Sequence, residues 1–501
     1  MIGIVLAILY AAFFIFLIRR LSFFQIDGIS RNALSAAFIV KILFGIIFWM
    51  IYSFNGHYQG RADALLYFDD GKEIYNVLFK NPVDYLKILL GSDDVSLSHY
   101  LKNTGNWSKT YNQGIYNESR TIIRFNALVD IFSFGNYHAH TVFICFLSLT
   151  GLTGILKFFL TYLNDKKKEL FVIIFLIPSV LFWGSGVLKE GLILFAMGML
   201  LYHFHLSLNE KIPSMRILLI LFFAGLLCIT KAYIFLFFLP IFIAHAWIVK
   251  TENRKPAIKY LAVFTIFASL VMLQQKIDIP FMLMDKQRQS IYMSAGGSHL
   301  GIPEENKFIY ISPEFPNRII PLKDKPGYCK IVPGVPYVSW YFEDYTDSIY
   351  VLHSTDTTTY WVYFDLEQSG SRIDIPFLYP SYTSMIKNAP AAFVNTAFRP
   401  HIFEAKNSMM LMSAVENLFL ILLMVLCLCF PSKKIRNAHI LYLCISFAVL
   451  LFVLIGLTTP ILGAVVRYKI PALPFFLIIF LIILDKEKLL NKFPLLKKIL
   501  A

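Results

Sequence analysis

Residues 35–54 of the chain read SAAFIVKILFGIIFWMIYSF, and residues 57–75 read HYQGRADALLYFDDGKEIY. The first stretch is apolar over a length that crosses the hydrocarbon core of a bilayer, and Lys41 is its one charged residue. The second stretch carries three aspartates among aromatic side chains, which are Asp63, Asp69 and Asp70. Together they predict a membrane-spanning helix that leads directly into a polar loop at the membrane surface.

Apolar runs of the same kind recur along the whole chain. Hydrophobic residues make up 57% of the sequence and charged residues 16%, a charged fraction well below that of soluble proteins. The runs are continuous and do not alternate, which favours helices over a transmembrane β-barrel. We predict an all-α polytopic membrane protein with about eleven transmembrane helices, interfacial helices, and a small, partly β extracytoplasmic domain.

The predicted spans and the polar regions between them divide the chain. The spans cover about 2–18, 35–54, 139–162, 169–184, 188–206, 215–230, 232–249, 260–275, 408–430, 439–457 and 470–484. The resulting segments are 1–54 with the first two helices, 55–136 as an extracytoplasmic loop with interfacial helices and the acidic motif, 137–275 with helices three to eight, 276–407 as an extracytoplasmic domain, 408–484 with helices nine to eleven, and 485–501 as a basic cytoplasmic tail.

Clusters of basic residues lie in every second connection between the spans, so all of them fall on one side of the membrane and define its orientation. The clusters are Arg19 with Arg20, Lys166 to Lys168, Lys211 with Arg216, Arg254 with Lys255, Lys433 with Lys434, and the tail. Placing them in the cytoplasm puts the N-terminus outside and the C-terminus inside. The same clusters account for the net charge of +14, so we infer no nucleic-acid partner.

The two long polar regions differ in character. In the first, apolar residues of 74–78 share a helical face, and Asn81-Pro82 predicts the start of a second short helix. Amphipathic helices of this kind are expected to lie in the plane of the membrane interface. In the second region, Ser348–Leu352 and Thr357–Phe364 are rich in β-branched and aromatic residues, which predicts strands.

Charged residues also gather at the outer ends of the predicted spans, on the same side as the acidic loop. They are Lys189 and Glu190, Lys231, Arg399, Glu416, and the run Arg467, Tyr468 and Lys469. Cations there oppose the normal bias of positive charge toward the cytoplasm, so another cause is required. A bound anion would supply that cause, and we assign this set as candidate substrate-binding residues.

Sugar transfer from a polyprenyl phosphate or diphosphate donor fits this arrangement. The lipid tail stays in the bilayer, and the outer cations neutralise the phosphate leaving group. A carboxylate would deprotonate the acceptor hydroxyl as it attacks the anomeric carbon, and Asp63 is the first candidate for this base. Asp69 and Asp70 are further catalytic candidates, with metal binding or helix capping as alternatives. The chemistry demands no cofactor, and a divalent cation is left open.

The acidic stretch also carries a family resemblance. Asp63-x-x-x-Tyr67-x-x-x-Gly71 after an early span resembles the first outer loop of GT-C-type membrane glycosyltransferases. The segments Pro178–Glu190, Thr230–Tyr233 and Arg467–Pro471 look like parts of bacterial surface-polysaccharide membrane proteins, including O-antigen-polymerase-like ones. The GT-C resemblance implies that an acidic residue of the loop, here Asp63, is catalytic. One additional span before the loop departs from the usual GT-C pattern.

Plainer interpretations exist for each candidate residue. The three aspartates suit a solvated loop, Lys189 and Glu190 suit a pair at a helix start, and Lys231 and Lys469 suit snorkelling side chains. Glu416 suits either a functional role or a structural partner such as Arg399.

At the level of function, the alternatives are a repeat-unit polysaccharide polymerase, a lipid-linked glycan flippase and a non-catalytic scaffold. A transporter places charges near the membrane midplane and often repeats its halves. In this chain the charges gather at one edge and the halves do not match. We therefore favour an inverting glycosyltransferase that binds a polyprenyl-phosphate-linked sugar and membrane lipid.

Overall fold

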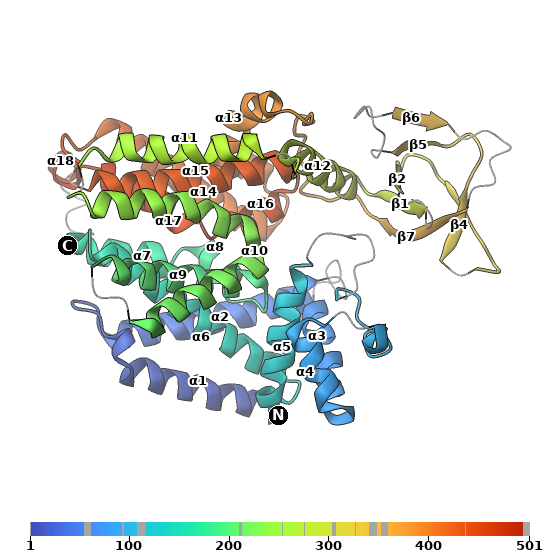
Figure 1. Ribbon diagram of the computed structural model, residues 1–501, viewed down its shortest axis with the longest axis horizontal. Helices are drawn as coiled ribbons and strands as arrows, with labels where there is room; N and C mark the ends of the chain where they lie inside the picture. The colour runs from blue at the N-terminus through green and yellow to red at the C-terminus, as the bar shows by residue number, and fades with distance from the viewer. Residues whose placement is uncertain are drawn as a thin grey trace. The chain divides into compact units, whose positions relative to one another are not determined.

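The computed structural model describes residues 2–54, 62–92, 95–107, 117–209, 213–252, 254–274, 276–302, 307–325, 327–339, 348–351, 359–435 and 437–493 (Figure 1). The residues before Ala62 in the acidic stretch, and with them Lys211, Leu352, Thr357, Thr358 and the end of the basic tail, lie outside the described residues. The chain forms two compact units, one of residues 1–267, 423–448 and 470–501 and one of residues 268–422 and 449–469.

The first unit is helical. Its helices are α1 (Ile2–Arg20), α2 (Arg31–Phe54), α3 (Asp63–Lys80), α4 (Pro82–Leu90), α5 (Ser119–Ser133), α6 (Tyr137–Leu160), α7 (Lys167–Phe175), α8 (Pro178–Trp183), α9 (Lys189–Asn209), α10 (Ser214–Val249), α17 (Leu473–Ile483) and α18 (Lys486–Lys492). The helices α11 (Pro256–Leu273), α14 (Ser408–Cys429) and α15 (Ala438–Thr458) contribute residues to both units.

Long apolar helices confirm the prediction of a helical integral membrane protein. Within the described residues, eight helices are long and apolar enough to cross a membrane, or up to nine if the bent pair α16 (Leu462–Tyr468) and α17 forms one span. One predicted span, 169–184, is instead the two short helices α7 and α8. Pro178 explains the break, because proline disfavours helical backbone in the residue before it, and Ile177 is extended.

The 36-residue helix α10 is broken at Lys231, where φ is −155° and ψ is 84°. His203 and Phe204 are neighbours on α9, yet His203 stacks on Phe223 and Phe204 stacks on Phe242. In a straight helix those two phenylalanines would lie about 28 Å apart. The two arms of α10 therefore fold back on each other at Lys231, and Figure 1 shows them as separate green helices that meet near the α10 label. This break lies at the predicted boundary between the spans 215–230 and 232–249.

Helices α3 and α4 form where the sequence predicts amphipathic helices. The Asn81 side chain accepts hydrogen bonds from the backbone N–H groups of Val83 and Asp84, at 3.1 and 3.3 Å, so it caps α4 as predicted. Tyr85 and Ile88 are buried on one face of α4. The opposite face exposes three large apolar side chains, which are Val83, Leu86 and Leu90.

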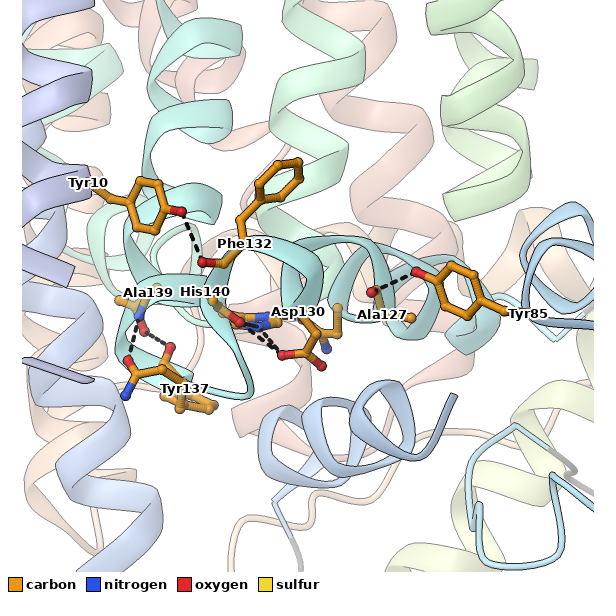
Figure 2. A network of polar contacts seen from close by, with 12 residues as sticks. Tyr10, Tyr85, Ala127, Asp130, Phe132, Tyr137, Ala139 and His140 are labelled. Carbon is orange, nitrogen blue, oxygen red and sulfur yellow. Dashed lines mark hydrogen bonds and ion pairs between the residues drawn. The ribbon is translucent and has the colours of Figure 1, made fainter. Parts of the chain in front are cut away.

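Helix α5 is fixed to three other helices through its second half (Figure 2). Tyr10 of α1 donates to the Phe132 carbonyl at 2.9 Å, and Tyr85 of α4 donates to the Ala127 carbonyl at 3.0 Å. His140 of α6 lies 2.8 Å from the buried carboxylate of Asp130. Buried imidazole–carboxylate contacts of this kind are costly to break, so α5 is held firmly in place.

The second unit combines helices with a small β-sheet. Beside α16 it contains α12 (Ile279–Ala295) and α13 (Tyr382–Phe398), and strands β1 (Gly297–Ile302), β2 (Lys307–Ile311), β3 (Ile319–Pro321), β4 (Tyr328–Ile331), β5 (Pro336–Ser339), β6 (Ser348–Val351) and β7 (Tyr360–Leu366). The described strands pair antiparallel in the order β3-β4-β7-β1-β2-β5-β6. Its core includes Leu300, Ile309, Ile311, Cys329 and Ile331. The expected strands in 276–407 are therefore present.

Candidate functional site

Two lysine side chains meet one carboxylate in the first unit. The Nζ atom of Lys189 lies 2.8 Å from Oε1 of Glu118, and the Nζ atom of Lys231 contacts the same oxygen. We call these three residues the lysine–glutamate cluster. It joins the predicted substrate-binding residues Lys189 and Lys231, which are separated by more than forty residues in sequence.

Each member of the cluster stands where a helix begins or breaks. Lys189 is the first residue of α9, directly after the turn that follows α8. Lys231 occupies the break in α10, and Glu118 precedes the first residue of α5. The cluster therefore depends on three local irregularities of backbone and not on one helical face.

Burial differs between the partners. The side chains of Lys189 and Lys231 are only 8% and 9% exposed, whereas the side chain of Glu118 is 38% exposed. Burial disfavours the charged form of Glu118, but the nearby charges of Lys231 and Lys189 outweigh it and lower the pKa of Glu118 to about 2. Glu118 is thus an anion at neutral pH and a very weak base while both lysines contact it.

Helix α3 places the aromatic ring of Tyr67 beside this cluster. The Ser119 hydroxyl lies 3.2 Å from the Tyr67 hydroxyl, and the Nζ atom of Lys189 lies 5.8 Å from the centre of the Tyr67 ring. Asp63 is the first residue of α3 and is half-buried. Because it precedes Tyr67 by one helical turn, it shares the face of α3 that carries Tyr67.

The other two aspartates of α3 have different surroundings. The Asp70 carboxylate accepts hydrogen bonds from the backbone N–H groups of Gly105, Asn106 and Trp107 at 2.8–3.1 Å. Burial raises its pKa, although those hydrogen bonds act in the opposite direction. Asp70 therefore holds the 105–107 turn, a structural role that differs from the helix capping suggested by the sequence. Asp69 is exposed, on the side of α3 that faces away from Tyr67.

The remaining predicted residues belong to the second unit, except Glu190, which is buried next to Lys189 in the first. The fully buried Lys469 donates to the side-chain oxygen of Asn417 at 2.7 Å and reaches the Thr396 carbonyl at 3.4 Å. The buried carboxylate of Glu416 acts electrostatically on Lys469. These contacts replace the predicted snorkelling of Lys469 with an internal role.

Arg399 forms an ion pair with Glu404 in this unit, and not with Glu416 among its described partners. Arg467 lies over the ring of Tyr468, with its guanidinium carbon 5.9 Å from the ring centre. Both arginine and tyrosine are partly exposed. The sequence also predicts that Arg467 faces one outer cavity with Asp63, Lys189 and Lys231. Arg467 belongs to the other unit, so this stays a prediction.

Glu118 is the residue that sequence reasoning missed. Its one sequence signal is an acidic residue directly before the amphipathic helix 119–133, where a carboxylate is electrostatically favoured. The sequence could not indicate that both lysines would reach it. Among the described residues, no group of three or more histidine, cysteine, aspartate or glutamate side chains is arranged to hold a metal ion.

Comparison of the chain with protein-family models, with curated proteins and with solved structures found no match.

Proposed function

We propose that this integral membrane protein is a glycosyltransferase that uses a polyprenyl phosphate- or diphosphate-linked sugar donor at the outer face of the membrane, in the assembly of cell-surface polysaccharide or glycan. The observation that carries the proposal is the convergence of Lys189 and Lys231 on one position beside α3. Two nearly buried ammonium groups at one point suit the phosphate of a donor, because charge-assisted contacts are strongest away from water.

In this proposal Asp63 is the general base for the acceptor hydroxyl. Its position one turn before Tyr67 supports the assignment, because Tyr67 contacts both Ser119 and Lys189. Glu118 does not suit this role in the resting state, since a carboxylate with a pKa of about 2 accepts protons poorly.

The membrane setting of the proposal has three parts. The chain crosses a bacterial inner membrane about eleven times, with its N-terminus outside and its C-terminus in the cytoplasm. The acidic loop and the sheet-containing region 276–407 lie on the extracytoplasmic side of that membrane. The exposed apolar face of α4 rests on the outer leaflet, which brings α3 to the level of the lipid phosphates.

The decisive experiment is transfer by the purified full-length protein in detergent micelles. The substrates are a polyprenyl-phosphate-linked sugar and a crude lipid-linked acceptor fraction, and the readout is mass spectrometry of the extracted saccharides. A micelle has no two leaflets between which a lipid could move. A flippase therefore produces no new saccharide in this assay, whereas a transferase does. We expect transfer by the wild type and loss of at least about tenfold in Lys231→Gln, which removes one phosphate contact.

Lys157→Gln is the matched control, because Lys157 also lies over aromatic rings in the first unit but is remote in sequence from each part of the cluster. Equal transfer by the wild type and Lys231→Gln would reject the assignment of the phosphate site. Absence of transfer by the wild type, together with lipid-linked glycan movement across liposome membranes, would replace the proposal with the flippase alternative.

A further inference from the structure

We propose that Glu118 is the resting occupant of a phosphoryl-binding site formed by Lys189 and Lys231, and that a ligand's terminal phosphate or diphosphate displaces it. This inference rests on the proposed function, because it describes how a diphosphate-linked donor, or the polyprenyl phosphate that transfer releases, binds the same site. It also adds a specificity that the proposed function does not contain, namely a preference for phosphate groups that carry more than one negative charge.

The first argument is the geometry of the contacts. Both ammonium groups contact Oε1 of Glu118, so a single carboxylate oxygen serves two cations. A terminal phosphate offers three oxygens and can give a separate one to each lysine. The exchange therefore replaces a shared contact with two independent charge-assisted hydrogen bonds.

The second argument concerns which group can move. The lysines are attached at helix ends inside the bundle and are 8% and 9% exposed, whereas Glu118 is 38% exposed. A ligand that arrives from solvent therefore meets the carboxylate before the ammonium groups. The Glu118 side chain makes no capping hydrogen bond to α5, so its rotation leaves the start of the helix intact.

The third argument is that the backbone of α5 can stay in place during the exchange. Contacts hold α5 along its length: the Ser119 hydroxyl meets the Tyr67 hydroxyl and the Thr121 hydroxyl donates to the Ile229 carbonyl at 2.9 Å in its first turn. Ala127, Asp130 and Phe132 hold its second half, and none of these contacts involves the Glu118 side chain. Displacement thus requires only side-chain rotation, which is fast for a partly exposed residue.

Specificity follows from the charge that is exchanged. A phosphodiester carries one negative charge and would replace the carboxylate like for like, with little gain. A terminal phosphate or a diphosphate carries additional charge, which favours it in the field of two lysines. The site is therefore expected to select a donor linked through a diphosphate, or the polyprenyl phosphate that transfer releases, over phosphodiesters. Phosphodiesters include ordinary membrane lipids and also a sugar that is linked through a single phosphate.

The test measures binding to the full-length protein in phosphatidylcholine nanodiscs. Inorganic pyrophosphate is titrated as the soluble ligand, and a polyprenyl monophosphate incorporated into the disc is the lipid ligand. Phosphatidylglycerol is the phosphodiester competitor. We expect Glu118→Gln to bind pyrophosphate about tenfold more tightly than the wild type, because the displaced group is then neutral. Lys231→Gln should bind at least about tenfold more weakly.

The matched control is Glu169→Gln. Glu169 pairs with Lys486 at 2.6 Å in the same unit, and its side chain is 31% exposed, close to the exposure of Glu118. Its neutralisation should leave pyrophosphate affinity unchanged. Glu118→Asp serves as a second variant, because it keeps the charge but withdraws it by one methylene, and it should also tighten binding. Size-exclusion chromatography establishes that each variant is folded.

The outcomes separate this inference from the proposed function. If neither phosphate ligand binds the wild type or Glu118→Gln, the lysines form no phosphate site and the proposed function falls with the inference. If both bind but Glu118→Gln and Glu118→Asp bind no more tightly than the wild type, the displacement is wrong while the phosphate site stands. If pyrophosphate binds and the polyprenyl monophosphate does not, the result would support displacement and exclude a lipid source. If phosphatidylglycerol competes at equal concentration, the result would contradict the proposed specificity.

Discussion

Asp63 begins α3 one helical turn before Tyr67, and this position makes it the residue on which the proposed chemistry depends. We predict that Asp63→Asn lowers glycan transfer by roughly 10²–10⁴-fold, because an amide keeps the shape of the side chain but cannot accept a proton. The measurement is extraction of lipid-linked saccharides with surface-glycan analysis in cells that carry the variant as the sole copy.

Asp69→Asn is the control for that prediction, since Asp69 lies on α3 but is exposed. It should retain wild-type glycan output. Full output by Asp63→Asn at normal protein level would show that the base is another residue, and Glu416 would then be substituted.

The ion pairs of Glu118 predict a pH-dependent contribution to stability. The two lysines hold its pKa near 2, below the ordinary value of 4.5, so the folded state favours the anion. A depressed pKa contributes stability above the ordinary pKa, and that contribution is lost as pH falls through the folded value. In detergent, the unfolding temperature of the wild type should therefore exceed that of Glu118→Gln at pH 6. The difference between the two temperatures should shrink from about pH 4.5 toward pH 2. A difference that stayed constant across this range would argue against the ion pairs.

Among the individual site residues, the sequence indicated only some. It indicated Lys189 and Lys231, because cations at the outer ends of apolar spans stand out against the charge bias. It could not indicate Glu118, because nothing local distinguishes a ligand of two distant lysines from any polar loop residue. It also could not tell the structural role of Asp70 from catalysis, since three backbone N–H groups of the 105–107 turn define that role.

Helices α6 and α9 approach each other through glycine. A Cβ atom at Gly198 would lie 1.9 Å from the carbonyl oxygen of Gly151, so the backbones are in direct contact. We predict that Gly198→Ala destabilises the protein by about 1–3 kcal/mol, because the two helices must move apart. The measurement is thermal or denaturant unfolding in detergent.

Gly225 in α10 provides the opposite case. A Cβ atom there has no other atom within 4 Å, so Gly225→Ala introduces no overlap. The variant should be unchanged or more stable by about 0.5–1 kcal/mol, through the higher helix propensity of alanine. Equal behaviour of the two variants would contradict the close packing of α6 against α9.

Element types could be predicted well because apolar runs and helix caps are local signals. The Asn81 cap of α4 and the break at Lys231 both followed from adjacent residues. The predicted span 169–184 was wrong as a continuous helix, because hydrophobicity alone does not register that Pro178 interrupts it. The strand order of the sheet depends on pairings between distant residues, and composition does not encode it.

The orientation of the whole molecule is testable by chemical labelling. In a variant that lacks the six native cysteines, single cysteines are placed at Asp63, Asp324 and Lys167. The first two should react with a membrane-impermeant thiol reagent in intact cells, and the third should not, because basic clusters stay in the cytoplasm. Reaction at position 167 alone would invert the proposed topology.

The fold-back of α10 at Lys231 has a consequence for how the protein is synthesised. Its 36 residues are nearly twice the length that a bilayer accepts as one helix, and a single residue separates the two arms. No hydrophilic loop separates the arms, so we expect them to leave the translocon as a pair. The ribosome makes Glu118 first and Lys231 last of the three charged partners. Glu118 can therefore form its contact with Lys231 only after this hairpin has been synthesised and inserted.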